Sequence, residues 1–150
     1  MDYQQSRAYI RDAEQYAGGA LDLTNIKEIM KRLGNPQDQL KYVHVAGTNG
    51  KGSVIAYLYT TLTNAGYHVG RYISPSVYSY REKIEVEGKP ISREQFAKHT
   101  TRVAAVIEEM TAEGLAHPTP FEIETAVAFL FFAEEKCDPV ILEVGMGGIT

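Results

Sequence analysis

The stretch VHVAGTNGKGSV, residues 43–54, constrains the fold more than any other part of this chain. It places three glycines around a single lysine, Lys51, and a hydroxyl residue, Ser53, follows. Glycines allow successive backbone N–H groups to point at one anion, and a helix that starts there adds the positive end of its dipole. The stretch therefore predicts a phosphate-binding loop between a strand and a helix.

In this interpretation Lys51 reaches the terminal phosphates of a nucleotide, and Ser53 binds Mg²⁺ through its hydroxyl. The sequence differs from the usual P-loop motif, because Gly52 separates the lysine from the hydroxyl residue and Val45 occupies the position of the first glycine. A tight turn with an incidental lysine is the alternative. The residues expected to hold the nucleotide are Gly47, Thr48, Asn49, Gly50, Lys51, Gly52 and Ser53.

Strands and helices are predicted to alternate along the rest of the chain. The strands are expected at residues 42–45, 69–73 and 140–144, and Glu87-Gly88 is expected to form a hairpin turn. The helices are expected at 4–17, 24–33, 53–65, 93–112 and 120–135. Alternation of this kind predicts an α/β fold with a P-loop-type parallel sheet and helices on both faces. The helix at 120–135 is apolar on most faces, so we expect it to be deeply buried.

Ligands of such sheets bind beyond the carboxyl ends of the strands, where the glycine loop, Ser74 and Glu143 are all expected. A carboxylate near the end of an apolar strand is costly unless a positive charge compensates it. We interpret Glu143 as a Mg²⁺ ligand across from Ser53; the alternative is a sheet-edge residue that meets solvent or a backbone N–H. Ser74 precedes a proline, and a Ser-Pro pair after a strand is by itself typical of an ordinary turn.

Composition narrows the class of protein. A chain of 150 residues is about one domain. A net charge of −4 gives no indication of a nucleic-acid or membrane-surface partner. Cys137 is the only cysteine, which fits a reducing compartment, and the longest apolar run, residues 126–133, is too short for a membrane span. The N-terminus has no secretory signal pattern, so we expect a cytoplasmic protein.

The spelling HVAGTNGKGSV resembles that of the folylpolyglutamate synthase and dihydrofolate synthase family, within the Mur ligase group, which inserts a glycine between the lysine and the hydroxyl. The segments GALDL, GYHVGRYISP, EGKPIS and HPTPFEIETAVAFLFFAEEKCDPVILEVGMGG are similar to family segments in order and spacing. The resemblance covers essentially the whole chain and implies part of a Mur-ligase central ATPase domain.

The resemblance also implies cofactors and site residues. ATP and Mg²⁺ are the implied cofactors, Lys51 and Glu143 the catalytic residues, and Ser74 joins Ser53 and Glu143 as a metal ligand. Glu122 has a competing role, because it stands three residues after Thr119 in a helix-capping pattern. The residues implied to border the pterin pocket are Leu23, Thr24, Asn25, Thr119, Phe121 and Glu122.

The implied reaction is the ATP-dependent addition of L-glutamate to a carboxylate of a folate or dihydropteroate, through an acyl phosphate. We expect residues 1–150 to form the N-terminal part of the ATP-binding domain, ending after the third parallel strand, without the C-terminal glutamate-binding domain. Such a fragment should not ligate glutamate by itself. We expect its parent to be a monomer and the fragment to self-associate through an exposed sheet edge.

Three other interpretations remain open from the sequence. The first is a peptidoglycan-type Mur ligase, from which the segment 119–122 and its helix distinguish the folate branch. The second is a P-loop regulatory switch or kinase, a class whose Gly-Lys-Ser/Thr motif has the hydroxyl residue directly after the lysine. The third is a folding fragment that binds nothing.

Overall fold

The computed structural model describes residues 1–17, 24–44, 57, 60–74 and 79–144 of the chain. The chain divides into two compact units, residues 1–37 with 92–131 and residues 38–91 with 132–150. The boundary between residues 131 and 132 falls inside the helix α5 (Pro120–Glu134), so α5 contributes to both units. No helix among the described residues combines the length and the apolar character that a bilayer crossing requires.

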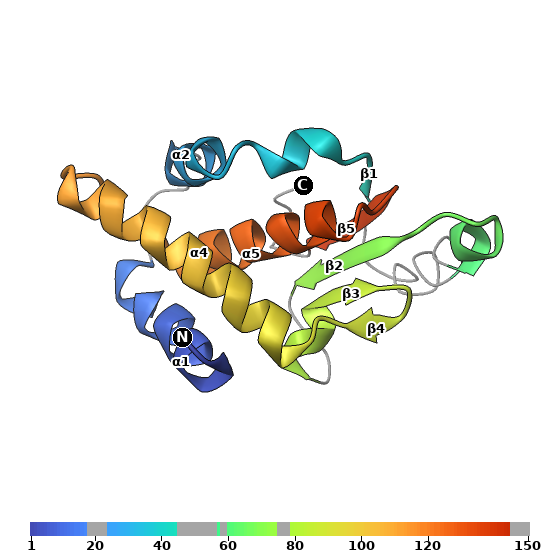
Figure 1. Ribbon diagram of the computed structural model, residues 1–150, viewed down its shortest axis with the longest axis horizontal. Helices are drawn as coiled ribbons and strands as arrows, with labels where there is room; N and C mark the ends of the chain where they lie inside the picture. Colours follow the sequence, from blue (N-terminus) through green and yellow to red (C-terminus); the bar gives the residue numbers. More distant parts are fainter. Residues whose placement is uncertain (18–23, 45–56, 58–59, 75–78, 145–150) are drawn as a thin grey trace. The chain divides into compact units, whose positions relative to one another are not determined.

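The first unit is helical. The predicted helix at 4–17 is observed as α1 (Tyr3–Asp12) followed by the 3-10 helix η1 (Ala13–Tyr16), and α2 (Thr24–Arg32) comes next. The long helix α4 (Arg93–Ala112) begins at the predicted capping box, where the Gln95 N–H donates to Ser92 Oγ at 3.0 Å. In Figure 1, α1 runs beside α4, and the ring of Tyr3 meets Phe96 edge-on with centroids 5.5 Å apart.

The apolar helix α5 is deeply buried, as the sequence predicts. Its buried residues occur on nearly every side of the helix, which fits a composition with no polar face. The α5 residues of this unit with no exposed surface are Ile123, Ala126, Val127 and Ala128.

The second unit contains a five-stranded sheet in the order β1-β5-β2-β3-β4. Its strands are β1 (Tyr42–His44), β2 (Gly70–Ser74), β3 (Ile84–Val86), β4 (Lys89–Pro90) and β5 (Val140–Val144). The strand β5 pairs in parallel with β1 on one side and β2 on the other. The predicted parallel α/β arrangement is therefore confirmed, with the last strand of the sequence lying between the first two (Figure 1).

An antiparallel hairpin extends this sheet beyond β2. The turn between β3 and β4 is the predicted Glu87-Gly88 pair, which has positive φ angles of 52° and 79°. Two successive positive φ angles match the turn that the twist of a two-residue hairpin favours. The sequence predicts the hairpin, while its antiparallel pairing with β2 makes the sheet mixed rather than purely parallel.

Both faces of the sheet are covered, and strand alternation decides which side chains meet which helix. On one face Val69 and Ile141 are fully buried, and Val43 and Leu62 pack against them. Leu62 belongs to residues 60–64, which are helical and lie within the helix predicted after the glycine loop. On the opposite face the backbone of Gly70 lies against Phe132 and Cys137.

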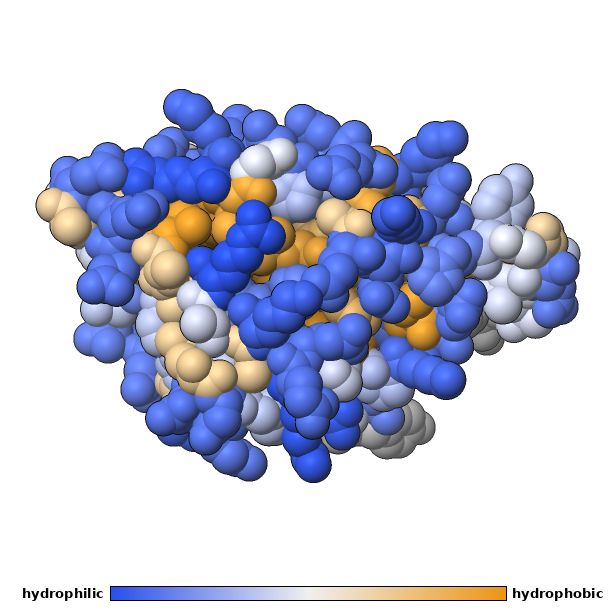
Figure 2. All heavy atoms as spheres, viewed as in Figure 1, coloured by the Kyte–Doolittle hydropathy of each residue, from blue (hydrophilic) through white to orange (hydrophobic). Residues whose placement is uncertain are grey.

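The surface view agrees with the composition. The face drawn in Figure 2 is mostly hydrophilic, with limited apolar areas between the polar side chains. Exposed large apolar residues such as Tyr57 and Tyr67, at 70% and 48% exposure, occur singly along the chain. Scattered residues of this kind are normal for a folded domain and do not indicate an interface.

Candidate functional site

The three parallel strands end together at one edge of the sheet, in the second unit. His44, the last residue of β1, pairs with Leu142 of β5, and Ser74, the last residue of β2, pairs with Val144. Glu143 is opposite Ile73 in the same register. Ser74 therefore stands one residue beyond the position that faces Glu143, at the edge where ligands of parallel sheets bind.

The predicted nucleotide-binding residues, Gly47 to Ser53, lie outside the described part of the chain. What is described on either side agrees with the prediction, because β1 ends at His44 and residues 60–64 are helical. The helix also ends as predicted, since Gly66 has a positive φ of 92° that glycine adopts without steric cost. A strand before the loop and a helix after it are the context that phosphate binding needs.

Glu143 is the predicted metal ligand whose side chain can be described. It is half-buried on β5, a strand with parallel neighbours on both sides. No cluster of three His, Cys, Asp or Glu residues in the described part of the chain has the arrangement to hold a metal. The predicted set differs from such clusters because it joins one carboxylate to the hydroxyls of Ser53 and Ser74.

The segment predicted to border the pterin lies in the first unit and caps α5. The backbone N–H and the hydroxyl of Thr119 both donate to Glu122 Oε1, at 2.9 and 3.1 Å, and the Glu122 N–H donates back to Thr119 Oγ1 at 3.4 Å. This reciprocal pattern is a capping box. The capping role of Glu122 is therefore confirmed, and both bonds that it accepts use the same carboxylate oxygen.

The other predicted substrate residues are placed only in part. Thr24 and Asn25 form the first turn of α2, with Thr24 exposed and Asn25 half-buried, while Leu23 lies outside the described residues. Phe121 is half-buried in the first turn of α5. Their contact with a substrate remains a prediction.

The structure adds a charged pair that the sequence analysis missed. Arg71 of β2 is directly opposite Glu85 of β3, and burial raises the pKa of Glu85 while Arg71 acts to lower it and Glu82 to raise it. Arg71 Nε is buried, with no hydrogen-bond partner in the described part of the chain. Only the register between β2 and β3, which local sequence does not specify, could have revealed this pair.

Comparison with known proteins extends these findings. No family model matches the chain. The dihydrofolate synthase/folylpolyglutamate synthase of Bacillus subtilis is 42% identical over 147 residues, which are 97% of this chain and 34% of that protein. The solved folylpolyglutamate synthase of Thermotoga maritima is 37% identical with a TM-score of 0.84, over 97% of this chain and 34% of that one.

A solved complex of a folylpolyglutamate synthase with AMPPCP and folate has a TM-score of 0.83 at 33% identity, over 99% of this chain and 36% of that one. The similarity in sequence and the similarity in structure thus both extend over nearly all of the chain. The chain spans about a third of the length of the relatives that it matches.

Proposed function

Since this chain belongs, over the third of their length that it spans, to the folylpolyglutamate synthase and dihydrofolate synthase family, we propose that it supplies the nucleotide-binding part of an ATP-dependent ligase. The ligase adds L-glutamate to a folate or dihydropteroate. The observation that carries the proposal is the shared edge at which β1, β5 and β2 end: the glycine-rich segment follows β1 in the sequence, Ser74 is the last residue of β2, and Glu143 is the next-to-last residue of β5.

The chemistry requires transfer of one phosphoryl group. An oxygen of the folate carboxylate attacks the γ-phosphorus of ATP, and the bond from that phosphorus to the β-phosphate oxygen breaks. ADP departs as the leaving group, and the folate now carries an acyl phosphate. The amino group of L-glutamate then attacks the acyl carbon, loses a proton and expels phosphate, which forms the amide. Lys51 and the backbone N–H groups of the loop stabilise the charge that develops on the transferring phosphoryl group.

Ser53, Ser74 and Glu143 are proposed to hold Mg²⁺. Hydroxyl and carboxylate oxygens are hard ligands of the type that this ion takes. What supports the set is that Ser74 and Glu143 both lie within the last two residues of neighbouring parallel strands. When bound, the ion would neutralise charge on the phosphates of ATP.

The substrate contacts are proposed by resemblance. Thr119, Phe121, Glu122 and residues 23–25 border the pterin in this proposal. Glu122 can keep its cap while contacting a ligand, because both capping bonds use Oε1. We place the reaction in the cytoplasm, which the single cysteine supports.

Self-association is proposed for the chain on its own. In the described sheet β1 is an outer strand, and an outer strand offers backbone groups to another copy. Sedimentation over a range of concentrations tests this point separately from catalysis, and a strictly monomeric chain would contradict it.

Nucleotide binding tests the core of the proposal. The 150-residue chain is titrated with ATP and with GTP in the presence of Mg²⁺, as wild type and as Lys51→Ala. Hydrogen bonds to charged groups contribute about 1.5–3 kcal/mol, so we expect ATP affinity to fall at least about tenfold. Lys41→Ala, which removes an exposed lysine before β1, is the matched control and should bind as the wild type does.

Unchanged ATP affinity in Lys51→Ala would overturn the assignment of the loop, and a preference for GTP would favour a regulatory switch. Ligation is tested on the protein that carries this segment, with ATP, Mg²⁺, L-glutamate and either dihydropteroate or a reduced folate. Mass spectrometry should detect the glutamylated product, and its absence with both acceptors would refute the ligase.

A further inference from the structure

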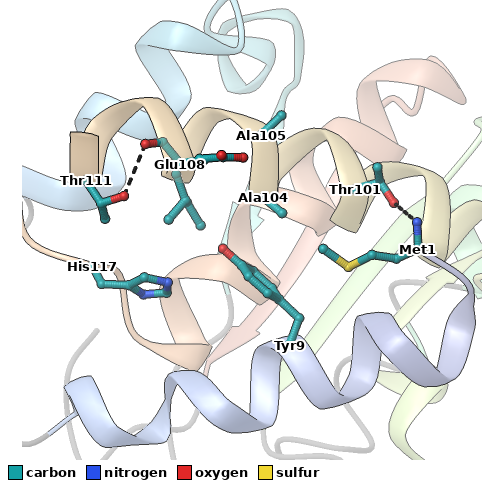
Figure 3. A pocket seen from close by; sticks show the side chains of 9 residues that line it. Met1, Tyr9, Thr101, Ala104, Ala105, Glu108, Thr111 and His117 are labelled. Atoms are coloured by element: carbon teal, nitrogen blue, oxygen red, sulfur yellow. Dashed lines mark hydrogen bonds between the residues drawn. The ribbon is translucent and has the colours of Figure 1, made fainter. Parts of the chain in front are cut away.

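A groove with a volume of about 500 Å³ lies between α1 and α4 in the first unit, and none of the predicted site residues lines it. Figure 3 shows Tyr9 of α1 directed toward α4, with Glu108 and Thr111 of α4 and His117 of the following segment at the same end. A volume of this size holds one small organic molecule.

Small side chains of α4 create the hollow. Ala104, Ala105 and Ile107 line it, and Ala104, Glu108 and Thr111 follow one another at the three- and four-residue spacing that places side chains on one helix face. The alanines leave apolar space that a larger residue would fill. This part of the groove suits an apolar group.

The end with Tyr9 carries hydrogen-bond acceptors. The Nδ1 of His117 is 2.8 Å from the carbonyl oxygen of Pro118, and because a carbonyl only accepts, Nδ1 carries the hydrogen. In the neutral ring Nε2 is then an acceptor. The stacked ring of Tyr16, 4.2 Å away between centroids at 14°, fixes the plane of His117.

Tyr9 and Glu108 make the same end electronegative. Burial raises the pKa of Tyr9 to about 12, with further contributions from Tyr16 and from the charge of Glu108. The phenol therefore stays protonated at neutral pH and brings no charge of its own, while its proximity to Glu108 leaves a negative potential beside the ring. The opposite end of the groove has the other sign, because the ammonium of Met1 donates to Thr101 Oγ1 there at 3.2 Å.

We propose that this groove binds a small organic cation that carries an apolar group, such as an alkyl- or arylmethylammonium ion. The carboxylate of Glu108 and Nε2 of His117 accept from its ammonium, and the face of Tyr9 adds the attraction of an aromatic ring for a cation. The apolar group rests on Ala104 and Ala105. An anion at this position would meet the charge of Glu108 instead.

The test compares three ligands of one shape and different charge. The chain is titrated with benzylammonium, benzyl alcohol and benzoate, and its backbone amide resonances are followed by NMR. Benzylammonium should shift the resonances of Tyr9, Ala104, Ala105 and His117, and should bind at least fivefold more tightly than benzyl alcohol. Benzoate should shift none of the four.

Two neighbouring glutamates provide a matched pair of variants. Glu108→Gln removes the groove carboxylate, and Glu109→Gln removes the same charge from the next residue of α4, which is exposed and outside the groove. Benzylammonium should bind at least fivefold more weakly to Glu108→Gln and unchanged to Glu109→Gln. Equal weakening in both variants, equal binding of benzyl alcohol, or no shift at the four residues would each overturn the proposal.

Discussion

Arg32 and Glu113 form a two-point ion pair in which Nη1 is 2.8 Å from Oε2 and Nη2 is 2.8 Å from Oε1. The pair joins the last turn of α2 to the residue that caps the end of α4. The Nε of Arg32 also donates to Glu28 Oε1 at 2.8 Å, one turn earlier on α2. Three bonds from one planar guanidinium fix its orientation, so this pair holds two helices of the first unit in register.

Glu113→Gln should lower the thermal midpoint at neutral pH and leave it unchanged in acid. The hydrogen bonds of Arg32 lower the pKa of Glu113, so the stabilisation is present above the ordinary glutamate pKa of about 4.3 and is lost as the pH falls through the lowered value. Thermal unfolding from pH 7 down to about pH 3 measures the effect. The control Glu109→Gln should show no such pH dependence, and a difference that persists in acid would contradict the prediction.

Gly70→Ala should destabilise the second unit by about 1–3 kcal/mol, the usual cost of overpacking. An added Cβ would lie 2.8 Å from Phe132 Cδ1 and 3.1 Å from Cys137 Sγ, and a ring carbon cannot yield as a flexible chain can. Urea unfolding measures the loss of free energy.

Phe132→Leu is the companion variant for Gly70→Ala, because it frees space at the same contact. The double variant should lose less stability than the two single losses added together. Additive losses would show that the added methyl group does not meet this ring.

Cys137 should react very slowly with thiol reagents in the folded chain. Burial raises the pKa of its thiol to about 12, and the charges of Glu135 and Glu87 act in the same direction. Only the thiolate is nucleophilic, so about one thiol in ten thousand is reactive near pH 8. Alkylation by iodoacetamide with and without denaturant tests this, and a native rate equal to the denatured rate would refute it.

Glu143→Gln should remove the dependence of ATP affinity on Mg²⁺ while leaving affinity without Mg²⁺ unchanged. The amide keeps the shape of the side chain and lacks the charge that a divalent cation requires. Titration of ATP with Mg²⁺ and with EDTA measures the difference, and Glu109→Gln serves as a charge-matched control outside the sheet. Wild-type Mg²⁺ dependence in Glu143→Gln would exclude the metal role.

The helices, strands and turns that depend on short sequence patterns were predicted well. The strand Val140–Val144 was predicted with its observed bounds, and the Ser92–Gln95 box and the Glu87-Gly88 turn appear where propensity and capping place them. The pairing of β3 with β2 was not predicted, because a register between strands depends on packing that neighbouring residues do not encode.

Site features formed by neighbouring residues could likewise be predicted from the sequence, whereas features assembled from distant segments could not. The Thr119–Glu122 box could be read from four consecutive residues. The groove of Tyr9, Glu108 and His117 comes from three separate segments, so no spacing in the sequence indicates it. The roles of residues 47–53 remain predictions.

The central place of β5 has a consequence for how the protein is made. A ribosome completes β1 and β2 well before it reaches Val140, yet each of these strands finds its parallel partner only in β5. Until Val144 has left the exit tunnel, the nascent chain therefore presents β1 without its partner and β2 paired only with β3, so chaperones can bind these strands and wrong pairing can occur. Ser74 cannot pair with Val144 before then, so the edge that carries the proposed nucleotide site is completed only after β5 has been made.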